Sequence, residues 1–383
     1  MNWIKKTLKK YSATLFITVM VLFILESISS IAYYQLVKPV NYNISSTIEA
    51  ILKVTGKPTS SSQYKKLVEI NKKSSAEDML YPNYLYEPQF HHPREFYSLS
   101  NIANSRIIGC DEAGYFNYWK SDEFGFRNPA KTYETHSDIL LIGDSFTEGA
   151  CENEMGTIAG YLRSSGLKVA NIGKTGSGPL YQLATLVEYA PVYKNNKVVW
   201  IIFTANDLRN LREEKTTQLS AYLDASYSQQ LVKNSEKVNK QLKGFLEKQI
   251  SNSNRRMKNG LPLIVNTGYG ESLDLIDAES KESFILREVA SRILTEVKKI
   301  DSELKIVILN HHKYDKEIQE LTSKVIKEFA VSRDIDYLEI SREYLNKNKS
   351  MYTERGMHFN KDGYRAIGEE IRAWLDGEGN KVL

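Results

Sequence analysis

Residues 138–149 read Asp-Ile-Leu-Leu-Ile-Gly-Asp-Ser-Phe-Thr-Glu-Gly, and this stretch constrains the fold more than any other. Ile139–Ile142 are four consecutive apolar residues, which is typical of a strand buried on both faces. Gly143-Asp144-Ser145 ends the strand abruptly, and Thr147-Glu148 begins a helical pattern. A strand that runs directly into a helix is typical of an open α/β sheet. Such sheets place their chemistry at the carboxyl ends of the strands, where this serine stands.

Four later apolar segments predict the other strands of the same sheet. Helical patterns separate the last of these segments, and strands that alternate with helices favour right-handed crossovers and a parallel sheet. The predicted strands are Ile139–Ile142, Lys168–Ile172, Val198–Phe203, Ile306–Leu309 and Ile335–Ile340, and the predicted helices are Phe284–Ile300, Ile318–Phe329 and Lys361–Leu375. The predicted fold class is therefore α/β, with a five-stranded parallel sheet.

Three further segments combine residue types that serve a reactive serine. Gly176 lies in a glycine-rich loop, Gly173–Pro179, where backbone amides can approach a ligand closely. Asn206-Asp207 come soon after the third predicted strand, and His358 lies just before the closing helix. Since an imidazole can take the proton of a serine hydroxyl, His358 is a candidate base for Ser145.

Taken in order, these four segments resemble the sequence blocks of the SGNH (GDSL-type) hydrolases, and the resemblance covers residues 100–380. It implies a flavodoxin-like three-layer α/β/α sandwich and an esterase that works through an acyl-serine intermediate. Thr204 stands where the third block of the family usually has glycine, which leaves the neighbouring asparagine in place. Asp144 and Asp207 would brace their loops.

The resemblance also implies a catalytic role for four residues. Ser145 would be the nucleophile and His358 the base. The amides of Ser145 and Gly176 and the side chain of Asn206 would stabilise the oxyanion of the tetrahedral intermediate. Each such donor lowers the barrier by on the order of 3 kcal/mol.

One position departs from the family's pattern. The family usually has an aspartate three residues before the histidine, and here Arg355 occupies that position. The nearest acid is Glu354, which could reach the His358 ring only through a bent loop. Three possibilities remain: a triad completed by Glu354, a Ser–His dyad oriented by a backbone carbonyl, or an enzyme of reduced activity. Losing the orienting acid costs some serine hydrolases several orders of magnitude in rate.

The N-terminus carries a targeting pattern. Four lysines precede Ala13–Leu25, which are thirteen residues without a charge, and Glu26 interrupts the run. A complete span needs about 20 apolar residues, so this core is short. We predict that residues 1–37 comprise cytoplasmic lysines and a transmembrane signal anchor, with a cleaved signal peptide as the alternative. The rest of the chain would then be extracytoplasmic, at the periplasmic or outer face of a membrane, or secreted after cleavage.

The remaining chain is predicted to hold a stalk, a domain and an insertion. Residues 38–85 are rich in Ser, Asn and Lys and are predicted to form the stalk, and residues 86–383 the hydrolase-like domain. The insertion, at about 209–283, is too long for a plain connection. In it, Gln229–Ile250 has the pattern of an amphipathic helix, which the polar run Ser251–Arg256 is expected to end. We expect this insertion to be a lid or a surface for envelope-assembly partners, or else an extra helix packed on the core.

Two cysteines fit an oxidising compartment. Cys110 precedes the first strand of the sheet and Cys151 follows Ser145 closely. A bridge between them would close a loop of about 40 residues, which contributes ~4 kcal/mol in the chain-entropy model. The alternative is two unpaired buried thiols, but an even count in an exported chain favours the disulfide. No Cys/His spacing suggests a metal site, and no cofactor is predicted.

Charge argues against nucleic acid as a partner. The chain has 51 basic and 47 acidic residues, and four of the basic ones are the N-terminal lysines, so the remainder is balanced. A protein that binds nucleic acid usually presents a basic patch, and none stands out here.

The predicted function is that of an extracytoplasmic serine esterase that deacylates, most simply deacetylates, a cell-envelope or exported glycan. The glycan is inferred from the expected location. One alternative is an O-acetyltransferase that acts on a polysaccharide with the same residues. Another is a non-catalytic glycan-binding or scaffold protein, for which Arg355 is the main argument.

Overall fold

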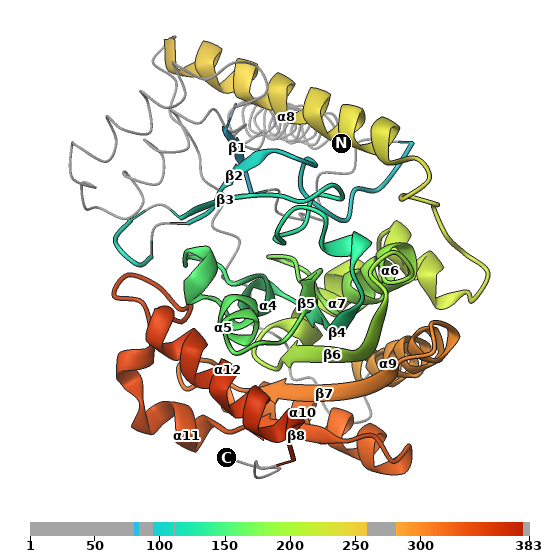
Figure 1. Ribbon diagram of the computed structural model, residues 1–383, viewed down its shortest axis with the longest axis vertical. Coiled ribbons are helices and arrows are strands. Elements are labelled where there is room, and N and C mark those ends of the chain that lie inside the picture. Colours follow the sequence, from blue (N-terminus) through green and yellow to red (C-terminus); the bar gives the residue numbers. More distant parts are fainter. Residues whose placement is uncertain (1–79, 84–94, 111, 116, 259–280, 378–383) are drawn as a thin grey trace, which may run out of the picture. The chain divides into compact units, whose positions relative to one another are not determined.

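The computed structural model describes residues 80–83, 95–110, 112–115, 117–258 and 281–377 (Figure 1). The chain divides into two units, one made of residues 1–54 and 247–271 and the other of residues 55–246 and 272–383. Of the first unit, the structure describes only the second half of one helix. The elements that carry the candidate site all belong to the second unit.

Five parallel strands form the central sheet, in the order β5-β4-β6-β7-β8. They are β4 (Ser137–Gly143), β5 (Val169–Asn171), β6 (Asn195–Phe203), β7 (Glu303–Leu309) and β8 (Tyr337–Ile340). The predicted five-stranded parallel sheet is confirmed. Because β4 lies between β5 and β6, the loops that leave these three strands open side by side at one edge, as in other sheets with this flavodoxin-like order.

Alternate residues of the central strands face two helical layers. In β6, Trp200 and Ile202 pack with the first layer, whereas Ile201 and Phe203 pack with the second. The first layer contains α6 (Pro179–Tyr189), α7 (Asp207–Glu214), α9 (Lys281–Lys299) and α10 (Lys316–Ser332), and the second contains α5 (Ile158–Ser164) and α12 (Lys361–Leu375) (Figure 1). The result is a three-layer α/β/α arrangement.

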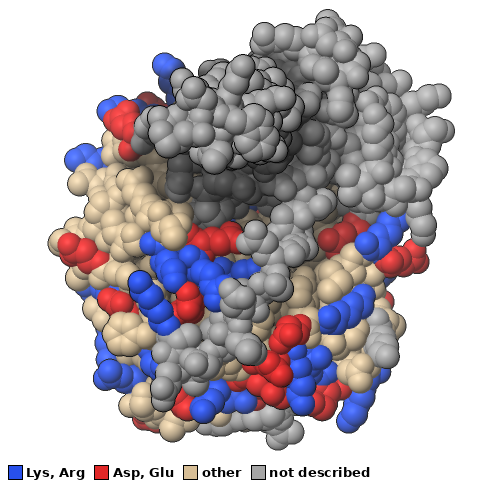
Figure 2. Space-filling model, turned by 180° about the vertical axis from the view of Figure 1, so that it is seen from behind, with Lys and Arg blue, Asp and Glu red and all other residues tan. Residues whose placement is uncertain are grey.

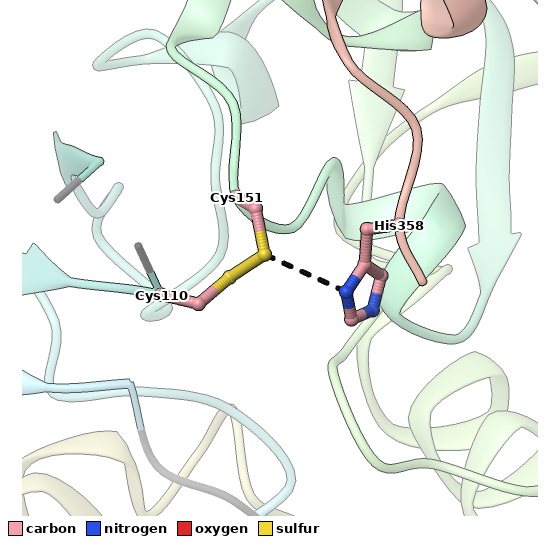
Figure 3. Close-up of side chains that lie close together, drawn as sticks. All are labelled: Cys110, Cys151 and His358. Carbon is pink, nitrogen blue, oxygen red and sulfur yellow. Dashed lines mark hydrogen bonds between the residues drawn. A yellow bond between two sulfur atoms is a disulfide. The ribbon is translucent and has the colours of Figure 1, made fainter. Parts of the chain in front are cut away.

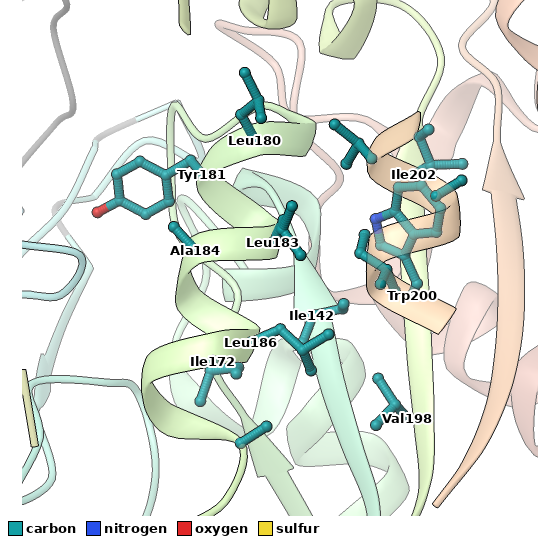
Figure 4. Packing of buried hydrophobic residues seen from close by; sticks show 14 of the residues in the cluster. Ile142, Ile172, Leu180, Tyr181, Leu183, Ala184, Leu186, Val198, Trp200 and Ile202 are labelled. Carbon is teal, nitrogen blue, oxygen red and sulfur yellow. The ribbon is translucent and has the colours of Figure 1, made fainter. Parts of the chain in front are cut away.

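The first layer shows how burial fixes the sheet against its helices. Leu183 and Leu186 of α6 lie close to Trp200 and Ile142 of the neighbouring strands (Figure 4). The Trp200 indole N–H is also satisfied, because it donates to Gln182 Oε1 at 2.7 Å. Fully burying each such apolar side chain stabilises the fold by roughly 1.5–3 kcal/mol.

The closing helix α12 begins and ends where its sequence predicts, at Lys361 and Leu375. The Asn360 side chain caps it by accepting hydrogen bonds from the backbone N–H groups of Asp362 and Gly363. The cap fixes the chain two residues after His358. The start of α12 therefore places the candidate base.

A second, smaller sheet precedes the central one. It contains β1 (Leu80–Pro82), β2 (Arg106–Ile108) and β3 (Tyr118–Lys120), with β1–β2 parallel and β2–β3 antiparallel. Residues 80–82, assigned above to the stalk, are thus a strand. Trp119 and Ile107 pack against Leu242 and Leu246 of α8. The loop between β2 and β3 carries Cys110.

The helix α8 (Ser235–Lys258) differs from its prediction at both ends. It cannot begin at Gln229, because the N–H groups of Gln229 and Leu231 donate to the Glu188 carboxylate and Gln230 has a positive φ. It continues through Ser251–Arg256, so the predicted break is wrong. Serine and asparagine cost a helix only some tenths of a kcal/mol each, and no proline interrupts the run.

The other described elements are short. They are α4 (Ser145–Glu148), α11 (Arg342–Lys347), and the 3-10 turns η1 (Thr132–Glu134), η2 (Glu154–Gly156), η3 (Gln218–Leu223) and η4 (Lys349–Met351). Within the described ranges no helix is long and apolar enough to cross a membrane. The predicted anchor at 1–37 and residues 38–79 of the predicted stalk lie outside those ranges.

Basic and acidic side chains lie close to one another on the surface seen in Figure 2, where one cluster of Lys and Arg has acidic neighbours. This mixture fits the balanced charge of the chain beyond its N-terminal lysines.

Candidate active site

Ser145 begins α4 directly after β4, as the sequence pattern predicts. The turn needs Gly143, since its φ is +153° and a Cβ there would meet Thr147 Oγ1 at 2.2 Å. Asp144 caps the helix by accepting a hydrogen bond from the Phe146 N–H at 3.0 Å. The serine is buried, with 6% of its surface exposed, so its side chain has little freedom.

His358 is within hydrogen-bond distance of this serine. Its Nε2 atom lies 3.0 Å from Ser145 Oγ. The loop that carries it is closed by an isolated bridge between Tyr352 and Phe359 and by a hydrogen bond from Thr353 N–H to the His358 carbonyl. The structure thus brings together the two residues that sequence analysis paired as nucleophile and base.

The carboxylate at the histidine ring comes from Glu112 and not from Glu354. Glu112 Oε1 lies 3.0 Å from His358 Nδ1. Its Oε2 atom accepts hydrogen bonds from the N–H groups of His358 at 3.0 Å and Met357 at 2.9 Å. Glu354 is exposed, so the proposed triad with Glu354 is a prediction that this geometry corrects.

The loop before the histidine is built around Glu112. The Arg355 N–H donates to the Glu112 carbonyl at 3.2 Å, so the position where the family has aspartate contacts Glu112 through its backbone. Gly356 permits the close approach, because a Cβ there would lie 1.9 Å from Glu112 Oε2. An acid from another segment therefore takes the position beside Nδ1.

Glu112 and His358 shift each other's pKa, and the carboxylate stays ionised beside the ring. Burial alone would raise the pKa of Glu112, but the His358 charge and the hydrogen bonds lower that pKa to about 2. Burial also lowers the pKa of His358, but the charge and hydrogen bond of Glu112 outweigh it and leave the pKa above its ordinary 6.5. An ionised carboxylate only accepts, so Nδ1–H donates to Glu112 and neutral Nε2 is free to accept from Ser145.

The predicted disulfide between Cys110 and Cys151 is present. Its Cys151 Sγ atom lies 3.5 Å from His358 Nδ1, so the bridge borders the ring (Figure 3). These three residues form the one group of metal-ligating type found within the described ranges. The two cysteine sulfur atoms are bonded to each other, so they lack the thiolate charge that a metal ligand needs.

The predicted oxyanion donors come from the loops beside Ser145. Gly176 follows β5 and has φ +82°, and within the described chain its N–H has no acceptor. Asn206 is the N-cap residue of α7, just after β6. Since β5 and β6 flank β4, the three loops share one edge of the sheet.

Replacing Asn206 by alanine is expected to lower kcat for ester cleavage by roughly 10²–10³-fold with little change in KM, because an oxyanion donor acts mainly in the transition state. The matched control is Asn196→Ala, since Asn196 is exposed at the opposite end of β6 and should leave kcat unchanged. Steady-state kinetics of both variants measure this. A kcat of Asn206→Ala equal to that of wild type would remove Asn206 from the oxyanion site.

A buried ion pair that sequence analysis missed braces the Gly176 loop. Lys174 and Glu148 are almost completely buried, with Nζ 3.5 Å from Oε1. Glu148 Oε2 also accepts from the Thr175 N–H at 3.0 Å and from Asn83 Nδ2 at 2.8 Å. Lys174 and Glu148 lie close in the sequence to the motifs around Ser145 and Gly176, which could have pointed to the pair. Charged residues are also common on exposed helices and loops, so the ion pair was not predicted.

Asp144 and Asp207 lie where bracing residues are needed. Asp207 Oδ2 accepts from the Phe203 N–H at 2.8 Å, which fixes the turn after β6. Burial raises the pKa of Asp144 to about 7 and raises that of Asp207 as well. Neither is hydrogen-bonded to the His358 ring.

His311, two residues after the end of β7, supports the loop that carries the base. It is fully buried, and burial lowers its pKa to about 3, so it stays neutral. Its Nδ1 accepts from the Lys313 N–H at 3.1 Å, which leaves Nε2–H to donate to the Met357 carbonyl at 2.9 Å. This hydrogen bond anchors Met357, the residue before His358, to the segment that follows β7.

A serine, a histidine and a carboxylate linked by hydrogen bonds at the carboxyl edge of a parallel sheet define an α/β serine hydrolase site. Residues 139–371 match the sequence model of the GDSL-like lipase/acylhydrolase family. The chain belongs to this family and is a carboxylic ester hydrolase. Comparison with curated protein sequences gives no match.

Several solved structures are similar to part of this chain. A GDSL-like lipase from Bacteroides thetaiotaomicron has 13% sequence identity and a TM-score of 0.35, covering 65% of this chain and 91% of its own. The acetyl xylan esterase AlAXEase has 12% identity and a TM-score of 0.37, covering 63% and 100%. A catalytic mutant of an acetylxylan esterase from Geobacillus stearothermophilus has 11% identity and a TM-score of 0.36, covering 64% and 96%.

Proposed function

We propose that this enzyme cleaves esters through an acyl-serine intermediate, with Ser145, His358 and Glu112 as a triad. The observation that carries the proposal is an unbroken series of hydrogen bonds. Ser145 Oγ lies 3.0 Å from His358 Nε2, and His358 Nδ1 lies 3.0 Å from Glu112 Oε1. Glu112 thus supplies the orienting carboxylate. Its apparent loss, with Arg355 at the family's aspartate position, was the main argument for the scaffold alternative.

The proposed reaction has two halves. Ser145 Oγ attacks the ester carbonyl while His358 Nε2 takes its proton, and Glu112 stabilises the imidazolium that forms. The amides of Ser145 and Gly176 and the Asn206 side chain stabilise the oxyanion. The imidazolium then protonates the departing alcohol, and a water molecule, deprotonated by His358, releases the acid and restores the serine.

The proposed substrate is an esterified glycan of the cell envelope or an exported polysaccharide, outside the cytoplasm. Two features of the chain support this location. Lysines followed by an apolar run at the N-terminus are typical of an exported or anchored chain, and the Cys110–Cys151 disulfide is typical of an oxidising compartment.

A fluorophosphonate tests the mechanism, because it reacts with activated serines. The full-length wild-type protein is expected to gain one adduct by intact mass, and Ser145→Ala none. An adduct that persists on Ser145→Ala, or its absence on folded wild type, would contradict the acyl-serine proposal.

Acetate release tests the substrate class separately. With acetylated envelope-type polysaccharides, the wild-type enzyme is expected to release acetate, and Ser145→Ala is expected to release only the background amount. If wild type cleaves p-nitrophenyl acetate but no member of the glycan panel, the substrate proposal is wrong while the mechanism stands.

A further inference from the structure

Glu112 reaches the candidate site from outside the segment that matches the family. The family match begins at residue 139, whereas Glu112 lies in the loop between β2 and β3 of the smaller sheet. The loop and the His358 segment are far apart in the sequence and meet only in the folded protein. Something must therefore hold this loop in place if its carboxylate is to serve the histidine.

The strongest link is the disulfide, only two residues from Glu112. Cys110 is bonded to Cys151, whose Sγ atom also lies 3.5 Å from His358 Nδ1 (Figure 3). Asn117 Nδ2 and the Tyr115 hydroxyl add hydrogen bonds to Glu152, at 2.9 and 2.6 Å. The covalent bond thus fastens the acid's loop to the turn that follows the nucleophile helix.

Hydrogen bonds hold the Cys151 side of this link in place. The buried Arg127 side chain donates to the carbonyls of Gly149 at 2.7 Å and Glu152 at 2.6 Å, on either side of Cys151. On the other side, two backbone hydrogen bonds close the base of the loop, from Gly109 to Asn117 and from Asn117 to Cys110. Breaking the disulfide would leave the Cys151 turn held by Arg127, and it would leave the loop that carries Glu112 held by hydrogen bonds alone.

We propose that the Cys110–Cys151 disulfide is a positioning element that holds Glu112 against His358, so that full activity requires the oxidised protein. The inference rests on the proposed function of Ser145, His358 and Glu112. Reduction by a dithiol adds two electrons and two protons to the disulfide, gives two thiols, and converts the dithiol to its own disulfide.

Dithiothreitol applied to full-length protein tests this directly, because the chain has only these two cysteines. Reduction is expected to lower kcat/KM by roughly 10–10²-fold, the size of the loss caused by ångström-scale misplacement of a catalytic group. Thiol titration confirms reduction, circular dichroism monitors the fold, and fluorophosphonate labelling counts active sites. In Cys110→Ser/Cys151→Ser protein, dithiothreitol should have no effect.

The pH profile separates positioning from plain stabilisation. Asp144 and Glu148 also raise the pKa of His358, and neighbouring His311 is neutral, but none of these is tied to the loop by the disulfide. Losing Glu112 alone should therefore move the acid limb of kcat/KM to lower pH. A disulfide that only stabilised the fold would reduce the number of active sites and leave the limb in place.

A double comparison makes the inference specific to Glu112. In Glu112→Gln protein, reduction is expected to change kcat/KM by less than about 3-fold, since the group that the disulfide positions is already gone. Equal losses in both backgrounds, or full activity after complete reduction of wild type, would overturn the inference. If Glu112→Gln itself kept wild-type activity while Ser145→Ala lost it, the acid assignment would fail and the acyl-serine mechanism would remain.

Discussion

Replacing Ser145 by alanine is expected to lower kcat for ester cleavage by roughly 10⁴–10⁶-fold, and His358→Ala by a similar factor. The serine oxygen forms the bond to the acyl group, and without Nε2 its proton has no acceptor at 3.0 Å. The double variant should lose little more than either single one, because residues that act as a unit are not additive. Steady-state kinetics with p-nitrophenyl acetate measure all three.

The fold should survive these changes, which keeps the result interpretable. Among the described residues the Ser145 side chain makes one hydrogen bond, to His358, and losing such a bond costs about 1 kcal/mol of stability. A matched control is Ser332→Ala, whose hydroxyl donates to the Phe329 carbonyl at the end of α10, far along the chain from the site. Suppose Ser145→Ala kept more than a tenth of wild-type kcat and formed no fluorophosphonate adduct. A nucleophile other than Ser145 would then carry the reaction.

The parts of this protein that could be predicted from sequence are those encoded by short-range patterns. Strands β4, β6 and β7 each contain a continuous apolar run, so their existence follows from residues that are neighbours in the chain. Ser145, Asn206 and His358 stand at strand ends or before a capped helix, where topology alone brings them to one edge.

The parts that could not be predicted depend on long-range contacts. Glu112 contacts a loop more than 200 residues later, and the sequence around it contains no pattern that specifies this partner. Glu188, on a different helix, keeps α8 from beginning earlier. Its carboxylate accepts hydrogen bonds from the backbone N–H groups of Gln229 and Leu231. The predicted disulfide was the one signal that could have led to Glu112, since it tied that segment to the nucleophile helix.

Replacing Glu112 by glutamine is expected to lower kcat by roughly 10²–10⁴-fold, whereas Glu354→Gln should change it by less than about 2-fold. The glutamine amide can donate to Nδ1 and so favour the tautomer whose Nε2 carries the proton, which cannot accept from Ser145. Glu354 is exposed, and it is Glu112 that is hydrogen-bonded to His358 Nδ1. Glu354 therefore serves as the matched control. Kinetics of both variants across pH make the measurement.

The pH dependence distinguishes orientation of the base from general damage to the site. The base works only when neutral, so kcat/KM of wild type falls as the pH drops through the His358 pKa, which lies above 6.5 because of Glu112. Removing the carboxylate charge lowers that pKa, so the acid limb of Glu112→Gln should move to lower pH while the plateau falls. Similar losses for Glu112→Gln and Glu354→Gln, or an acid limb that moves only with Glu354→Gln, would restore Glu354 as the orienting acid. An unmoved limb with a lowered plateau would mean that Glu112 supports the loop before His358 without acting on the ring.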